Sequence, residues 1–339
     1  MALPSLAAPA LPAAPRRERR HGAVLSPRLS FLLRRLGRML VAIAVVVVAT
    51  FLLVHLVPGD AVRATLGPSA SPELVERVRA ELGLDQPLPV QFVQYVTGVF
   101  TGDLGQSLQS HRPVVEVIAQ RVGPTLLLGF SAFAIAGIVS LPLGIGTALA
   151  ARSARGRSAS RVVTALLGLV IAIPDYLVAV ALIALFSIGL GTLPAAGWGE
   201  PSMTVLPIVT LAIGPAAYLA RIVHVEMGEV LETAYMTTAR AKRLPARLLY
   251  LRHALPNIVS STLTIGGMTL SGLVAATVLV ETIFAIPGLG TTIVASITTK
   301  DYPMVQAVVL VFASLVLVLN LVVDLVLMTV DPRSSIAEG

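Results

Sequence analysis

The sequence predicts an all-α fold, that of a polytopic membrane protein with six transmembrane helices. Hydrophobic residues make up 55% of the 339 residues and charged residues only 13%, with a mean hydropathy of +0.86. Soluble globular domains carry about 25% charged residues, so this composition is typical of a membrane protein. Long apolar runs alternate with polar segments, and arginines gather in every second segment, as expected for a chain that crosses a bilayer repeatedly.

Composition also excludes several functional classes. The chain has no cysteine, which excludes disulfide frameworks, thiolate metal sites and cysteine nucleophiles. Its formal net charge is +7, but the cations stand beside apolar runs and aromatic residues are sparse. This placement is typical of membrane topology and of contact with anionic lipid, so we expect no nucleic-acid partner. The five histidines are isolated in the sequence, and we expect no metal site from this chain alone.

The N-terminal part reads as a tail followed by the first membrane-spanning helix. Residues 1–30 are rich in alanine, proline and arginine, and we expect a disordered basic cytoplasmic tail. A secretory signal peptide is the alternative, because basic residues precede an apolar run. That run, Met39–Val57, is too long for a signal-peptide core and ends without a cleavage site. Its 19 residues span roughly 28 Å as a helix, so residues 31–57 are expected to hold the first transmembrane helix.

Residues 58–122 are polar and predict an extracytoplasmic helical region. The string SPELVERVRAELGL is typical of a capped helix, with Ser71 before Pro72 at the first helical position. A second helical pattern runs through VQFVQYVTGVF and ends at the turn GDLGQS. The region has five arginines against seven acids, whereas residues 1–38 have eight arginines and one glutamate. This asymmetry places the N-terminus in the cytoplasm and residues 58–122 outside.

Residues 123–333 hold five further apolar runs, and residues 334–339 form a short tail. The runs are Pro124–Ala151, Val162–Ile188, Thr204–Ile222, Ile258–Ile283 and Met304–Val330. Between them, ARSARGRSASR and the stretch 227–257 are basic, while GLGTLPAAGWGEPS and FAIPGLGTTIVASITTKDYP read as external loops with helix breakers. The charge placement agrees with six spans and with both termini in the cytoplasm.

The stretch 227–257 is a polar, basic insert between two strongly apolar runs. Met227, Leu231, Ala234/Tyr235 and Thr238 recur at helical spacing and predict one amphipathic helix, which Pro245 breaks. A second helical piece has Leu244, Leu248, Leu251 and Leu255 on one side. Its cations, which include Arg252, would each cost roughly 2.5–3.5 kcal/mol at the bilayer centre, so we expect a structured cytoplasmic surface. An ordinary positive loop is the alternative.

The string TARAKRLPARLLYLRHALPN in this insert resembles the cytoplasmic coupling segment, or EAA loop, of ABC importer permeases. It is most similar to the dipeptide/oligopeptide/nickel family, whose version reads close to TARAKGL followed by RHALRN, and it indicates the B-type subunit of the permease pair. The strings GDLG, ETIFAIPGLG and DYPMVQ also resemble that family, and the likeness runs from about Phe31 to Arg333. The resemblance implies the type I ABC importer permease fold.

The same resemblance implies a membrane-spanning permease subunit of an ATP-driven, binding-protein-dependent importer for di- or oligopeptides. Implied partners are a homologous second permease, two ATPase domains, an extracytoplasmic solute-binding protein and membrane lipid, in the bacterial inner membrane. No Walker A string is present, and neither Lys242 nor Lys300 stands in that pattern. We therefore expect no enzyme and no cofactor in this chain, with ATP and Mg²⁺ bound by the partner ATPases.

Two alternatives to peptide import stay open. The first keeps the same family, with nickel or another small molecule as the solute in place of a peptide. From another class, an autonomous secondary transporter would need paired broken helices in its two halves, and only Pro174–Asp175 reads as one.

The resemblance places the ATPase contact on the insert, where the segment forms a short helix in a groove of the ATPase subunit. The matching residues are Thr238, Ala239, Arg240, Ala241, Lys242, Arg243, Leu244, Pro245, Arg247 and His253. For His253 we expect a structural hydrogen bond. The family usually has glycine where this chain has Arg243, so Pro245 is expected to supply the helix break instead.

Seven residues are candidates for the translocation pathway or its gate: Pro174, Asp175, Gly267, Ser271, Glu281, Pro287 and Gly288. An acid inside a span is a functional candidate by default, and Asp175 follows a proline that interrupts its helix. A hydrogen bond between helices is the alternative for Asp175. Glu281, Pro287 and Gly288 begin an external loop that the resemblance places near the pathway.

Two further features predict helix packing. Gly267, Ser271 and Ala275 form a stripe of small residues that permits close approach of another helix. Asp324 and Asn320 lie on one face of the last span, and we expect them to contact another helix instead of the solute.

Overall fold

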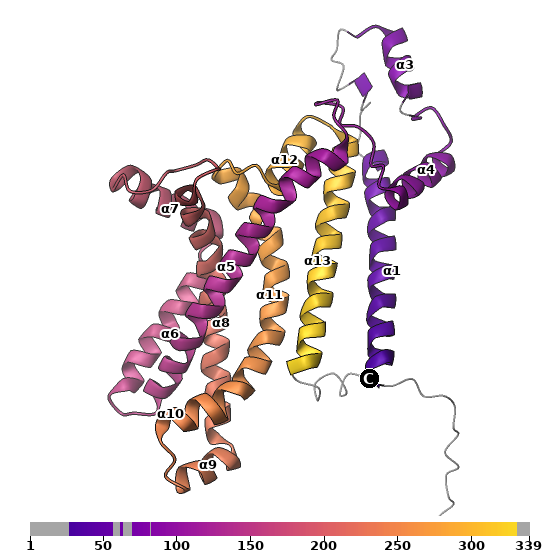
Figure 1. Cartoon of the computed structure of the whole chain (residues 1–339). Helices are drawn as coiled ribbons and strands as arrows, with labels where there is room; N and C mark the ends of the chain where they lie inside the picture. Colours follow the sequence, from indigo (N-terminus) through magenta and orange to yellow (C-terminus); the bar gives the residue numbers. More distant parts are fainter. Residues whose placement is uncertain (1–26, 57–61, 64–69, 82, 331–339) are drawn as a thin grey trace, which may run out of the picture.

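The described residues form helices joined by turns and loops (Figure 1). The computed structural model describes residues 27–56, 62–63, 70–81 and 83–330. Within these ranges five helices are long and apolar enough to cross a membrane, and a bent pair counted as one span makes six. This agrees with the predicted six spans. The predicted tails over residues 1–26 and 334–339 lie outside the described residues.

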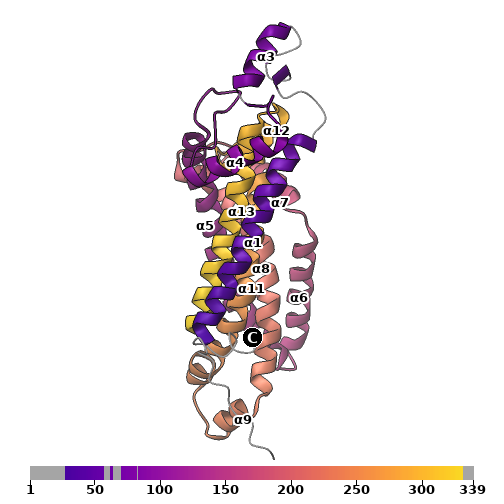
Figure 2. The same cartoon turned by 90° about the vertical axis from the view of Figure 1, so that its right-hand side faces the viewer.

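The long helices run side by side and define two ends of the bundle (Figures 1 and 2). One end carries the short helix α9 (Ala234–Ala241), and the other carries α3 (Pro72–Glu81) and α12 (Leu289–Thr298). These are named the α9 end and the α12 end below.

Helix α1 (Pro27–Leu56) lies beside α13 (Tyr302–Val330) at the edge of the bundle (Figures 1 and 2). Arg35 of α1 forms a salt bridge with Asp324 of α13, which confirms the predicted contact of Asp324 with another helix. Helix α1 begins at Pro27, inside the predicted tail 1–30. Proline fits the first turn of a helix, because the N–H that it lacks has no hydrogen-bond partner there.

Two short helices follow α1 along the chain at the α12 end. Helix α3 starts as predicted: Ser71 precedes Pro72, and its Oγ accepts a hydrogen bond from the N–H of Leu74 at 3.3 Å. Helix α4 (Leu88–Thr101) ends at Gly102, whose φ of +79° is the left-handed conformation that glycine adopts readily.

Helices α5 (Val114–Ala151) and α8 (Pro201–Glu232) are the longest in the described chain, and both extend beyond their predicted spans. Helix α5 begins ten residues before Pro124, so the predicted domain boundary between residues 122 and 123 falls inside a helix. Neighbouring helices and local adjustments compensate for the hydrogen bond that an interior proline removes, and proline therefore marks no helix end here. The prolines inside the two helices are Pro124, Pro142, Pro207 and Pro215.

Small residues bring α5 and α8 into close contact. A Cβ atom on Gly144 of α5 would stand 2.5 Å from the Cβ of Val223 and 2.6 Å from the carbonyl oxygen of Ala220, both in α8. Ala148, one turn after Gly144, is also buried in this region. The two helices pack at a separation that only a glycine at position 144 permits.

The third predicted span is two helices that meet at an angle of 98°. Helix α6 (Gly156–Ala172) is followed by α7 (Asp175–Leu182), which continues into the π-helical turn η1 (Ile183–Gly189). The prediction of one interrupted span over Val162–Ile188 missed this bend. Proline disfavours the helical conformation of the residue before it, so Ile173 has an extended ψ of 121° and the helix restarts in a new direction.

The last part of the bundle consists of α11 (Leu255–Ile283), α12 and α13. An irregular external loop was expected over FAIPGLGTTIVASITTKDYP, but Leu289–Thr298 form α12. Gly288 precedes this helix in an extended conformation, and its N–H donates a hydrogen bond to Thr291 Oγ1 at 3.2 Å. Burial against α5, α11 and α13 then stabilises a helix of ten residues, which would be marginal in isolation.

We predict that Gly144→Ala destabilises the protein by about 1–3 kcal/mol, because the new methyl group overlaps α8 and forces the helices apart. Gly146→Ala is the matched control, since no atom lies within 4 Å of a Cβ there and alanine favours the helix. Thermal unfolding of the detergent-purified variants measures both effects. Equal melting temperatures for the two variants would contradict the close contact.

Candidate functional site

Helix α8 and helix α9 are separated by a break at Thr233. Met227 and Leu231 belong to α8, so the predicted single helix from Met227 to Thr238 is wrong. Thr233 has an extended ψ of 153°, and its Oγ1 donates to the carbonyl of Val230 at 2.6 Å. Threonine stabilises such breaks through its hydroxyl, which competes with the regular helical hydrogen bonds.

Helix α9 ends in a Schellman motif centred on Arg243. The N–H of Arg243 donates to the carbonyl of Arg240 at 2.8 Å, and the N–H of Leu244 donates to that of Ala239 at 3.4 Å. Arg243 has a φ of +53°, the conformation for which helices usually use glycine. The helix therefore ends before Pro245, which caps the next helix; the prediction that Pro245 breaks the helix is wrong.

Helix α10 (Ala246–Leu248) continues through the π-helical turn η2 (Leu249–Ala254) into α11. A π-helical turn contains one more residue than an α-helical turn, so different residues face the core after it than a regular helix would place there. The predicted apolar side, which included Leu251, is therefore wrong: Leu251 is 53% exposed, whereas Leu249 and Ala254 are buried.

A small core fixes these helices to the end of the bundle. Met236 and Leu249 pack with Met227, Leu231 and other buried residues of α8. The guanidinium of Arg240 donates a hydrogen bond to the carbonyl of Leu231, which ties α9 to α8.

The remaining predicted coupling residues mostly point outward. We define the coupling surface by its exposed members, Thr238, Ala241, Lys242, Arg243, Pro245 and Arg247. Ala239 is buried, whereas Leu244 and His253 are partly buried. The carbonyl of His253 accepts a hydrogen bond from Asn257 Nδ2 at 3.0 Å, so its backbone takes part in the local hydrogen bonding.

At the α12 end, Glu281 is fully buried in a clasp that joins three helices. Its Oε1 accepts a hydrogen bond from Thr125 Oγ1 of α5 at 2.6 Å. Its Oε2 accepts one from the N–H of Gly290 at 2.6 Å and one from that of Thr291 at 3.2 Å. We call this arrangement the Glu281 clasp, and it fixes the first turn of α12 against α5 and α11.

The glycines around the clasp make room for the carboxylate. A Cβ on Gly288 would stand 2.3 Å from Glu281 Cδ, and one on Gly290 would stand 2.4 Å from the Cα of Val278. Glu281 and Gly288 therefore contact each other as part of one structural unit, while Pro287 lies beside it, partly buried. Sequence reasoning missed Thr125, because no local pattern connects positions 156 residues apart.

The small-residue stripe of α11 contacts α13 over only part of its length. A Cβ on Gly267 would overlap Val323, and Ser271 Oγ donates to Asn320 Oδ1 at 2.8 Å. Ala275 is exposed and takes no part in this contact. Gly267 and Ser271 are thus packing residues in this chain, separate from the Glu281 clasp.

Pro174 and Asp175 lie at the bend between α6 and α7. Asp175 begins α7, and its Oδ1 is 3.6 Å from the position of a Cβ on Gly214 of α8. Sequence reasoning missed Arg221, two turns farther along α8, although a cation within an apolar run is itself a signal of function.

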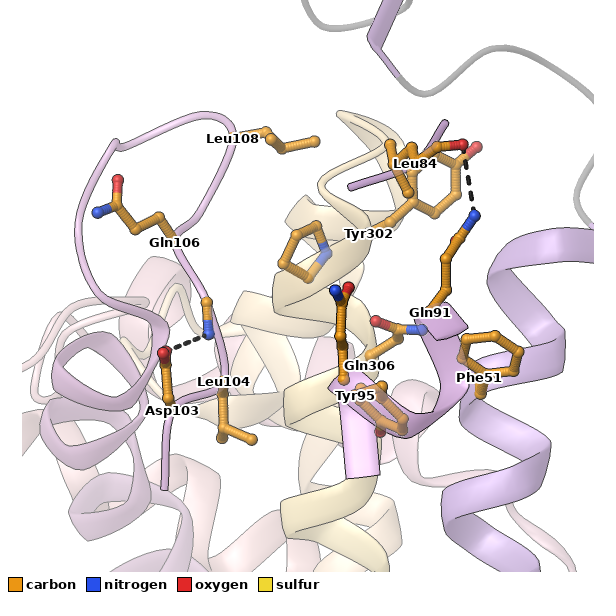
Figure 3. Close-up of a pocket in the computed structure, with 13 residues that line it drawn as sticks. Phe51, Leu84, Gln91, Tyr95, Asp103, Leu104, Gln106, Leu108, Tyr302 and Gln306 are labelled. Atoms are coloured by element: carbon orange, nitrogen blue, oxygen red, sulfur yellow. Dashed lines mark hydrogen bonds between the residues drawn. The ribbon is translucent and has the colours of Figure 1, made fainter. Parts of the chain in front are cut away.

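A cavity of about 250 Å³ lies between α1, α4, the loop 103–108 and α13 (Figure 3). Phe51 and Tyr95 form one wall, and Gln306 and Tyr302 of α13 form another (Figure 3). Burial raises the pKa of the Tyr95 phenol, and a hydrogen bond with Thr50 opposes that shift. The sequence held no signal for this cavity, because its walls come from distant segments.

Two models of one transport family match the chain. The model of the binding-protein-dependent transport system inner membrane component matches residues 140–336, and the model of the N-terminal part of such components matches residues 28–129. The chain belongs to this family. As a binding-protein-dependent transport component of the inner membrane it is a multi-pass transport subunit and not an enzyme, as predicted.

Curated relatives extend over most of the chain. The glutathione transport system permease protein GsiC of Salmonella choleraesuis (strain SC-B67) is 38% identical over 304 residues, which cover 90% of this chain and 98% of that protein. A putative peptide transport system permease protein of Brucella abortus (strain 2308) is 36% identical over 312 residues, again 90% and 98%. The predicted family of ABC importer permeases is thereby confirmed for this transport component.

A solved structure supports the fold. An inward-facing structure of the MetNI methionine ABC transporter is similar with a TM-score of 0.55 at 21% identity, over 63% of this chain and 96% of that chain. The likeness confirms the type I ABC importer permease fold for this inner membrane component.

We predict that Glu281→Gln lowers the stability of the α12 end by about 1–3 kcal/mol, because an amide nitrogen cannot accept the hydrogen bonds now made to one carboxylate oxygen. Fluorescence of Trp198, the chain's one tryptophan, reports on unfolding there, because it packs against the core that contains Phe284. Glu229→Gln, at an exposed position of α8, is the control. Unchanged melting of the Glu281 variant would show that the clasp contributes nothing.

We predict that Arg243→Gly stabilises α9 by about 1 kcal/mol, because glycine adopts a positive φ without strain. Lys242→Gly is the matched control: it removes the same charge at a φ of −74°, where glycine only adds entropy to the unfolded chain, so it destabilises α9. Amide hydrogen exchange of α9 measures both, and changes of the same sign would contradict the assigned conformations.

Proposed function

We propose that this chain is the permease subunit of an ATP-driven importer for short peptides, and that its coupling surface receives the motion of ATPase subunits. The observation that carries the proposal is the coupling surface itself: short helices anchored to α8 and α11 that expose Lys242, Arg243 and Arg247 at one end of the bundle. A partner that pushes on this surface moves α8 and α11 together, because a shared core holds both helices to α9. Hydrogen bonds from Arg240 to the carbonyl of Leu231 and from Asn257 to the hydroxyl of Tyr235 add to this contact.

Short peptides are the solutes that the relatives favour. GsiC is named for glutathione transport, and the Brucella abortus protein for peptide transport. Glutathione is itself a tripeptide, so both names indicate a peptide solute.

The proposed complex contains a homologous second permease, two ATPase domains that bind ATP and Mg²⁺, and an extracytoplasmic solute-binding protein. In the proposed orientation, the α9 end and both termini are cytoplasmic. The connection between α5 and α6 lies at the same end as α9 (Figure 1). Exposed arginines in this connection and in the first turn of α6 support the orientation through the positive-inside rule: Arg152, Arg155 and Arg157. The α12 end then faces the solute-binding protein.

Affinity purification of the tagged chain in mild detergent tests the proposal. We expect one or two ATPases with Walker motifs and a second permease to co-purify, and the complex to hydrolyse ATP. A chain that purifies alone, shows no ATPase activity and still moves solute in vesicles would support a secondary transporter.

Charge reversal then locates the contact. Lys242→Glu with Arg247→Glu is expected to release the ATPases, because both cations are exposed on the coupling surface. Arg155→Glu with Arg157→Glu makes the same change of charge at the same end outside that surface, and should keep the ATPases bound. Arg240 is left intact because it ties α9 to α8. Equal loss in both double variants would show a general charge effect.

A further inference from the structure

One face of α8 presents an aromatic residue and a cation to a cavity. Gly214, Tyr218 and Arg221 follow one another at spacings of four and three residues, which puts them on one face of the helix. Ile171 of α6 and Ile265 of α11 flank this face and, with Tyr218 and Arg221, line a cavity of about 510 Å³. Tyr218 is 45% exposed, so the chain leaves this face open.

Arg221 is exposed and lies one residue before the end of the predicted span Thr204–Ile222, on the side of α8 that faces α6. Its Nη1 is 3.4 Å from the position that a Cβ on Gly168 of α6 would occupy. Gly168 is seven residues farther along α6 than Arg161, or about 10 Å of helix. Among the described residues, no hydrogen bond or salt bridge to the Arg221 side chain is found. A guanidinium without a partner in the described chain is available to bind a carboxylate.

Asp175 provides an opposite charge two turns away. Asp175 lies against Gly214, which precedes Arg221 by seven residues on the same face of α8. About 10 Å along the axis of α8 therefore separates Arg221 from the position that Asp175 contacts. No salt bridge joins Asp175 to a cation of the described chain. Helices α6 and α7 meet at an angle of 98° just before Asp175. The carboxylate of Asp175 therefore lies at the bend and not within a continuous helix.

The geometry points to a binding site for a zwitterionic short peptide, with the carboxylate of the peptide on Arg221 and its ammonium group on Asp175. An extended peptide covers about 3.3–3.6 Å per residue, so two or three residues bridge the two levels. A guanidinium binds a carboxylate through two parallel hydrogen bonds. Ile171 and Tyr218 lie between the two charges and contact the side chains of the peptide. This inference rests on the proposed importer function and names its solute class and the residues that hold the solute.

Glu226 is the competing partner for the ammonium group, because it lines the same cavity. It follows Arg221 by five residues and Gly214 by twelve, so it is turned about 140° and about 120° around the helix axis from these two residues. A peptide that bound Arg221 and Glu226 would also leave Asp175 without a function. Asp175 is therefore the assigned partner, and Glu226→Gln is the variant that separates the two assignments.

The test measures equilibrium binding to the purified importer complex in the absence of its solute-binding protein, which removes the selectivity of that protein. The probes are trialanine, trialanine amide and N-acetyl-trialanine. Wild-type complex is expected to bind trialanine about ten-fold or more tightly than either blocked peptide, because each block removes one charged contact.

Each variant is expected to lose one preference only. Arg221→Gln should bind trialanine and its amide equally while still rejecting the N-acetyl peptide, and Arg221→Lys should restore part of the preference. Asp175→Asn should lose the preference against N-acetyl-trialanine alone. Glu226→Gln should behave as wild type.

Several results would overturn the inference: no binding of trialanine, equal binding of all three peptides by wild type, retained preferences in Arg221→Gln and Asp175→Asn, or loss of the N-acetyl preference in Glu226→Gln. Failure of the importer function itself is a different result. In that case the chain purifies without ATPases, and peptide uptake in vesicles does not depend on ATP and solute-binding protein.

Discussion

The close packing of α5 against α8 is the contact on which the rest of the bundle depends. Because Gly144 has no side chain, Val223 and the carbonyl of Ala220 occupy the space beside α5. Helix α8 then packs on its other sides against α6, α7 and α11, and its last turns contact α9. One helix therefore connects the bend at Pro174, the face that carries Arg221 and the coupling surface. A displacement of α8 along its axis therefore changes the contacts at the bend, at the face that carries Arg221 and at the coupling surface, because a packed helix moves as a rigid unit.

Polar groups inside the bundle divide into those with partners and those without. Glu281 receives three hydrogen bonds, Asp324 pairs with Arg35, and Asn320 accepts a hydrogen bond from Ser271. These groups stabilise contacts between helices, since a buried polar group that is satisfied within the chain costs little. Asp175 and Arg221 differ, because neither is paired within the described chain. Arg221 lies on the face of α8 that Asp175 contacts at Gly214. Of the groups without a partner, these two carry charge, and the proposed site assigns them to the charged ends of the solute.

The sequence predicted the fold class and the six spans because both follow from the length of apolar runs and the position of cations, which are local properties. It misplaced helix ends where tertiary contacts override a local signal. Pro124 lies inside α5, and Leu251 is exposed because the π-helical turn η2 shifts the buried face. Only part of the Glu281 clasp could be predicted from the sequence. Glu281, Pro287 and Gly288 stand in one string, whereas Thr125 lies 156 residues away from Glu281. Arg243 was visible as a departure from the family's glycine, but its positive φ explains why glycine is usual there.

In the proposed importer, the route from the coupling surface to the solute is short along both α8 and α11. On one side, Arg240 binds the carbonyl of Leu231, which is ten residues, or about 15 Å of helix, from Arg221. On the other side, α9 contacts α11 directly, because Asn257 Nδ2 of α11 donates a hydrogen bond to the Tyr235 hydroxyl of α9 at 2.9 Å. The chain also connects the two helices through Arg243, Pro245 and the π-helical turn η2. A force on α9 is thus transmitted directly to both α8 and α11. Since α6, α8 and α11 line the cavity around Arg221, displacement of α8 and α11 relative to α6 changes the shape of the cavity that holds the solute in the proposed site.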